Sequence, residues 1–108
     1  MRLAPLILVL AAAPVPGTAS LKSAWESCLQ SFAQVGSLGS QSDVTIAENA
    51  LAACSADEAR YGKALIRGTG SPSLSAKTSS SRAQQQLKLD QQELTIRLLT
   101  FIRRIRQA

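Results

Sequence analysis

The chain has 108 residues, with 12 Lys and Arg, 7 Asp and Glu, no His, 2 Cys and few aromatic side chains. This length supports one small domain and excludes a multidomain enzyme. Without His, the commonest general base and the commonest metal ligand are both missing, and two Cys cannot complete a four-ligand zinc site. No Gly-x-Ser-x-Gly or Ser-x-x-Lys motif activates a serine. The composition therefore favours a non-catalytic protein and predicts no cofactor and no metal.

Residues 1–19 are typical of a secretory signal peptide. Arg2 supplies the positive start, an apolar run follows over residues 3–15, and Gly17-Thr18-Ala19 places small residues at a cleavage site. The apolar run is shorter than the roughly 20 residues that a membrane-spanning helix needs. We therefore expect cleavage after Ala19 and export of the protein to the periplasm or the exterior.

Residues 20–67 show the apolar spacing of two amphipathic helices. The predicted stripe of the first helix is Leu21, Trp25, Cys28, Phe32 and Val35, and that of the second is Ala47, Leu51, Cys54, Tyr61 and Leu65. Gly36 can form a left-handed cap at the end of the first helix. The second can start at Ser42 or Asp43, or at the capping box that begins at Thr45. A short turn between the helices predicts an antiparallel hairpin.

The two cysteines lie on the apolar faces of these helices, at similar heights in such a hairpin. In an oxidising compartment, a Cys28–Cys54 disulfide is the simplest interpretation. A redox pair or an intermolecular link is the competing interpretation, but no Cys-x-x-Cys motif and no adjacent His or Lys lowers a thiol pKa. In the chain-entropy model, a bridge over this loop contributes about 3–4 kcal/mol.

The spacing of these residues also resembles a known kind of small protein. Trp25-x-x-Cys28-Leu29, the Thr45-Ile-Ala…Cys54 run and Tyr61 are similar to the two-cysteine helical hairpins of small exported proteobacterial proteins of uncharacterised function. The resemblance covers about residues 21–66. It implies a hairpin and carries over no functional residue.

Residues 68–81 are rich in Ser and Gly, which predicts a flexible linker. Residues 82–108 then predict a basic amphipathic helix. Its apolar arc contains Leu87, Leu94, Leu98, Phe101, Ile102 and Ile105, with Gln91 as the one polar member. This segment carries 6 basic and 2 acidic residues, whereas residues 20–76 carry 4 basic and 5 acidic ones. The predicted fold is thus all-α, a disulfide-linked hairpin followed by a linker and a basic helix.

Three interpretations of the C-terminal helix remain open. It can complete the domain by packing on the hairpin, lie on an anionic membrane surface, or self-associate as a coiled coil. Nucleic acid is disfavoured because no aromatic side chain alternates with the arginines. The leading hypothesis is an envelope protein that binds another protein; the alternative is a peripheral membrane-surface binder. The candidate contact residues are Leu94, Leu98, Phe101, Ile102 and Ile105, with Arg97, Arg103, Arg104 and Arg106.

Overall fold

The computed structural model describes residues 17–69 and 76–107. These residues form four α-helices and no strand: α2 (Thr18–Gly36), α3 (Asp43–Ala53), α4 (Ser55–Thr69) and α5 (Ala76–Gln107). The predicted all-α class is therefore confirmed. Residues 1–16 of the predicted signal peptide and 70–75 of the predicted linker lie outside the described residues. On either side of that gap, α4 continues to Thr69 and α5 already begins at Ala76, so part of the segment predicted as linker is helical.

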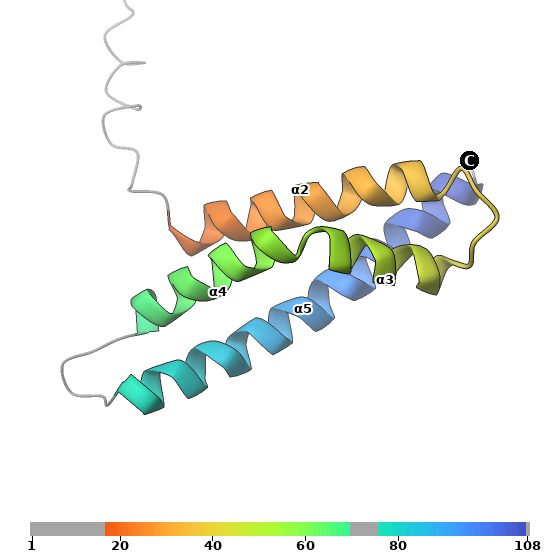
Figure 1. The fold of residues 1–108 in the computed structure, drawn as a ribbon. Coiled ribbons are helices and arrows are strands. Elements are labelled where there is room, and N and C mark those ends of the chain that lie inside the picture. Colours follow the sequence, from red (N-terminus) through yellow and green to blue (C-terminus); the bar gives the residue numbers. More distant parts are fainter. Residues whose placement is uncertain (1–16, 70–75, 108) are drawn as a thin grey trace, which may run out of the picture.

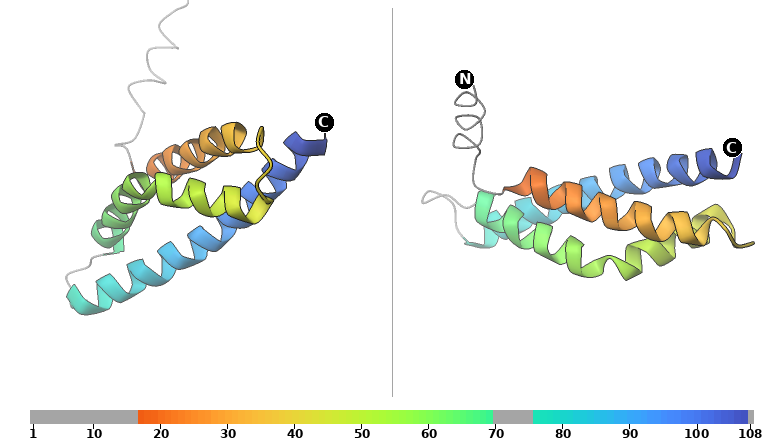
Figure 2. Two further views of the ribbon diagram at one scale, coloured as in Figure 1. Left: turned by 45° about the vertical axis from the view of Figure 1, so that its right-hand side comes forward. Right: turned by 90° about the horizontal axis from the view of Figure 1, so that it is seen from above.

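The helices pack as three rods, of which the middle one is divided into α3 and α4 (Figure 1). Tyr61 of α4 meets Asp90 of α5, and the chain runs in opposite directions along these two helices. In the view of Figure 1, α5 passes behind α3; Figure 2 shows the same helices from two other sides. α5 ends near the loop that joins α2 to α3, where Arg106 contacts the Gly39 carbonyl. None of the described helices is both long enough and apolar enough to cross a membrane.

A disulfide joins α2 to the junction of α3 and α4. It links Cys28 to Cys54, with 6.0 Å between the two Cα atoms, which confirms the predicted pairing. Cys54 is buried and Cys28 is partly buried against the core. The bond is compatible with an oxidising, exported location.

The second helix was expected to be continuous through residue 67, and this expectation is wrong. The helix is interrupted at Cys54, whose φ of −101° and ψ of 21° leave the helical range. The Cys54 carbonyl accepts from the backbone N–H groups of Asp57 and Glu58, so one residue ends α3 and starts α4. Acidic side chains in the first turn of α4 favour a helix start here, because they face the positive end of the helix dipole.

At the turn between α2 and α3, the two helices approach each other more closely than the sequence predicts. Of the possible starts that the sequence offers, Ser42 is the one that caps α3, since its side chain accepts from the Thr45 backbone N–H at 3.2 Å. Gly36 is not a left-handed cap: α2 includes it, and Ser37 follows with a φ of −69°. A Cβ atom at Gly36 would lie 2.9 Å from Cγ2 of Ile46, so the glycine is needed for the close approach of α3.

This close approach changes which face of α2 is buried. The buried residues are Trp25, Leu29 and Ala33, four residues apart. Phe32 and Val35, expected in the core, are 50% and 71% exposed. The small side chain of Ala33 lets α2 pack on its neighbours along this line, which turns the predicted stripe partly outward.

α5 packs on the other three helices and supplies a large part of the core. Leu94, Leu98 and Ile102 are almost completely buried, and each such side chain contributes roughly 1.5–3 kcal/mol. At the centre of the core, the rings of Trp25 and Tyr61 lie 5.9 Å apart. The Trp25 indole N–H is buried without a hydrogen-bond partner among the described residues, a cost of about 1–3 kcal/mol that the burial of its ring offsets.

Candidate functional site

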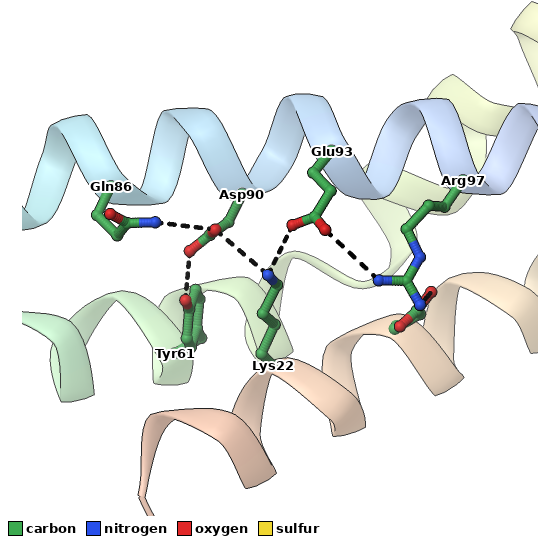
Figure 3. Close-up of polar contacts among 7 residues, drawn as sticks. Lys22, Tyr61, Gln86, Asp90, Glu93 and Arg97 are labelled. Carbon is green, nitrogen blue, oxygen red and sulfur yellow. Dashed lines mark hydrogen bonds and ion pairs between the residues drawn. The ribbon is translucent and has the colours of Figure 1, made fainter.

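A buried carboxylate lies where α2, α4 and α5 meet. Asp90 of α5 is 5% exposed and accepts hydrogen bonds from the Tyr61 hydroxyl, from Lys22 Nζ at 3.3 Å and from Gln86 Nε2 at 3.0 Å. These donors come from three different helices (Figure 3). The negative charge of Asp90 is thus compensated inside the fold, as a buried carboxylate requires.

The contacts continue along the surface towards the C-terminal half of α5. Lys22 Nζ lies 2.7 Å from Glu93 Oε1, and Glu93 Oε2 lies 3.6 Å from Arg97 Nη1. Arg97 Nη2 in turn lies 3.0 Å from Glu26 Oε2 on α2. We call the seven residues of Figure 3 the polar clasp: Lys22, Glu26, Tyr61, Gln86, Asp90, Glu93 and Arg97.

The clasp favours one protonation state for each of three groups. The hydrogen bond to Glu93 raises the pKa of Lys22, and the same bond lowers the pKa of Glu93. Burial, followed by the hydrogen bond to Asp90, raises the pKa of Tyr61. The phenol therefore stays protonated at neutral pH and cannot serve as a general base there. This arrangement therefore favours charge compensation between helices over proton transfer.

A basic groove begins where the clasp ends. It lies between α2 and α5, has a volume of about 260 Å³, and is lined by Gln30, Ile96, Arg97, Thr100, Phe101 and Arg104. Arg97 is engaged by Glu26, yet its side chain is still 55% exposed. Arg104 and its neighbour Arg103 form no ion pair within residues 17–69 and 76–107. The groove thus combines apolar surface with a cationic group that no acidic side chain of the described residues pairs with.

Other grooves on the surface are lined by residues of different charge. A groove of about 190 Å³ between α2 and α3, which we call the neutral groove, has no charged lining residue; Phe32, Val35, Gly36, Gln41, Ile46, Asn49 and Ala50 line it. A third, between α4 and α5, is lined by Ala59, Gly62, Lys63, Ile66, Ala83, Gln84 and Leu87. Neither pairs two arginines with an aromatic ring.

The predicted contact residues of α5 are divided between the core and the surface. Leu94, Leu98 and Ile102 are buried in the core, where a partner could contact them only if α5 moved away, and Phe101 and Ile105 are half-buried. Arg97 and Arg104 line the basic groove and Arg103 does not, although all three are exposed. Arg106 binds Asp43 at 2.8 Å and the Gly39 carbonyl at 3.1 Å.

The sequence prediction did not identify Lys22, Tyr61 and Asp90 as a polar group. A signal for Asp90 is present in the spacing: it lies four residues before Leu94 and eight before Leu98, on the line that is buried. The predicted arc passed through Gln91 instead. Tyr61 was expected in the core, and nothing local marks Lys22 as its neighbour.

Within the described part of the chain, no group of three or more His, Cys, Asp and Glu side chains is placed to hold a metal ion. A comparison with protein-family models, with curated proteins and with solved structures finds no match for this chain.

Proposed function

We propose that the protein is a small exported, non-catalytic interaction module that binds another protein at the basic groove between α2 and α5. The observation that carries this proposal is the lining of the groove. Phe101 and Ile96 offer apolar contact area, and Arg97 and Arg104 stand at its rim. Aromatic and Arg side chains are enriched at the energetically important positions of protein interfaces.

The groove is already formed in the folded chain, which lowers the cost of binding. The buried side chains of α5 and the polar clasp hold this helix in place. The residues that line the groove therefore lose little further backbone freedom when a partner binds. Gln30 and Thr100 add polar groups that can orient a partner. These features favour recognition of a shaped protein surface.

The alternative, a peripheral membrane-surface binder, requires the apolar arc of α5 to face lipid. Leu94, Leu98 and Ile102 of that arc are buried against the other helices. The large apolar side chains that α5 leaves exposed are Leu89 and Ile96, at 60% and 65%. Two aliphatic side chains offer little area for insertion, so the geometry favours a protein partner.

Site-specific photocrosslinking in the producing cell tests this function. A photoreactive amino acid at Thr100, inside the groove, is expected to give a discrete protein adduct that the additional substitution Arg104→Gln removes. The same amino acid at Val35, in the neutral groove, is the control and should not give that adduct. No adduct from Thr100, or the same adducts from both positions, would contradict the proposal.

A further inference from the structure

Arg97 is part of both the polar clasp and the basic groove. It ends the polar clasp, where its guanidinium lies 3.0 Å from Glu26 and 3.6 Å from Glu93. It also lines the basic groove beside Phe101 and Arg104. Glu26 of the same chain therefore already binds one of the two arginines that a partner would meet.

Building on the protein-binding function proposed above, we infer that the groove recognises an acidic segment of its partner, and that this segment competes with Glu26 for Arg97. Charge complementarity supports the inference. Guanidinium groups bind carboxylates in a planar, directional manner. Glu26, 3.0 Å from Arg97, shows that a carboxylate can reach this guanidinium. Arg104 offers the same chemistry and meets no acidic side chain in the described part of the chain.

The positions of the two arginines specify the spacing of the acidic groups. Arg97 and Arg104 are seven residues apart on one helix, which corresponds to about 10 Å along its axis. In an extended segment, side chains on the same face lie two or four positions apart, and four positions cover about 13 Å. Two acidic residues four positions apart, with an apolar residue midway between them to meet Phe101, therefore match the groove, because the flexible arginine side chains accommodate the difference in length.

Competition with Glu26 needs no rearrangement of the fold. The Arg97–Glu26 and Arg97–Glu93 contacts lie at the surface, where ion pairs are weak and exchange readily with other carboxylates. The clasp contacts of Asp90 with Tyr61 and Lys22 do not involve Arg97 and can persist when a ligand binds. Binding then moves one side chain while α5 keeps its place.

A concave site between two helices suits a peptide segment better than a flat lipid surface. A bilayer would touch the exposed side of α5, where Arg103 lies outside the groove lining, as readily as the groove itself. Arg103 therefore provides a matched control: it is adjacent to Arg104, carries the same charge, and is not part of the groove lining.

The test is fluorescence anisotropy with the oxidised protein and a labelled peptide that contains Glu-Ser-Leu-Ser-Glu, next to a control peptide with Gln at both acidic positions. We expect Arg104→Gln to weaken binding of the acidic peptide about threefold to fivefold, and Arg103→Gln to change it less than twofold. Glu26→Gln should instead strengthen binding, because Arg97 no longer has to leave its internal partner. Glu26→Ala repeats this measurement with a second side chain, and circular dichroism checks that each variant is folded.

Three results would overturn the inference: equal binding of the two peptides (including none), equal losses for Arg103→Gln and Arg104→Gln, or no gain from either Glu26 variant. Preferential binding to anionic phosphatidylglycerol vesicles, with Arg103 as important as Arg104, would also overturn it and favour a lipid surface. A persistent crosslink from Thr100 alongside any of these results would leave the protein-binding function in place and remove only the acidic partner.

Discussion

The two halves of α5 are held to the molecule by different kinds of contact. In the first half, Asp90 and Glu93 meet Lys22 and Tyr61, so that polar groups from three helices compensate one another. Ala83 and Leu87 add apolar contact there. In the second half, Leu94, Leu98 and Ile102 are buried in the core. The buried polar contacts of α5 thus lie in its first half, whereas its most deeply buried large apolar side chains lie in the second.

This difference determines which charged side chains of α5 have a partner of opposite charge among the described residues. The acidic groups of the first half have basic partners within the fold. In the second half Arg97 and Arg106 reach Glu26 and Asp43, but no described acidic residue pairs with Arg103 or Arg104. A helix that is anchored through its apolar face can keep cationic side chains available on its other faces. The first half therefore stabilises the fold, and the second half both stabilises it and carries the proposed binding surface.

Shortening a buried side chain in the second half should have the largest effect. Leu98 is 2% exposed, so Leu98→Ala is expected to lower the free energy of unfolding by about 2–5 kcal/mol through lost burial and a cavity. Urea denaturation of the oxidised protein measures this loss. Leu89→Ala, at an exposed position on the same helix, is the control and should change it by less than about 0.5 kcal/mol. Similar effects of the two substitutions would argue against α5 as part of the core.

Removing one donor from the clasp should have a smaller effect. Tyr61→Phe keeps the ring against Trp25 and deletes the hydroxyl that Asp90 accepts from, which should cost about 1–3 kcal/mol. In an Asp90→Asn background the same substitution should cost less, because the hydrogen bond to a charged acceptor is already gone. A double-mutant cycle measures this coupling. Strictly additive losses would show that the two residues do not interact.

The clasp should also limit stability at both ends of the pH range. Because the pKa of Glu93 is lowered below its ordinary value of 4.5, its contribution is present above that value and is lost as the pH falls. Because the pKa values of Tyr61 and Lys22 are raised, from 10.0 and 10.5, their contributions are present below those values and are lost as the pH rises. Unfolding free energy should therefore be greatest between about pH 6 and 9.

Lys22→Met separates the clasp from the other carboxylates in this experiment. The variant should be less stable at neutral pH and should lose less of its remaining stability on acidification, because Glu93 no longer has Lys22 as its partner. Urea midpoints at a series of pH values give both curves. Equal acid-induced losses in the two proteins would mean that Lys22 does not set the pKa of Glu93.

Substituting the exposed arginines should have the smallest effect on stability. Arg103→Gln is expected to change the free energy of unfolding by less than about 0.5 kcal/mol, because Arg103 has no described ion pair. Arg106→Gln removes contacts to Asp43 and to the Gly39 carbonyl and should cost up to about 1 kcal/mol. Thermal unfolding monitored by circular dichroism compares the two. A larger loss for Arg103 than for Arg106 would contradict this assignment of charges.

Local patterns in the sequence predict the helical class and the Cys28–Cys54 bond and include Ser42 among the possible caps, because each depends on residues close together or on a single available pairing. The break at Cys54 also had a local signal, since Ser55-Ala-Asp-Glu58 has the spacing of a capping box. That signal was obscured by an apolar stripe that continues across the break.

The remaining features depend on contacts between distant segments. Phe32 and Val35 turn outward because Ala33 and Gly36 let the helices approach on a different line, which no single helix reveals. Likewise, Lys22 and Asp90 are 68 residues apart in the chain. The basic groove could be predicted only in part: its arginines were identified, but Gln30 comes from another helix.

Amide hydrogen exchange along α5 in the oxidised protein tests most directly whether this helix is an integral part of the fold. We expect the amides from Asp90 to Ile102 to exchange as slowly as those of the buried segment of α2, because both are released only by global unfolding. Fast exchange throughout α5, with α2 and α3 still protected, would contradict it. The buried line of α5 would then be available to a partner, and a preformed groove between α2 and α5 would no longer explain binding.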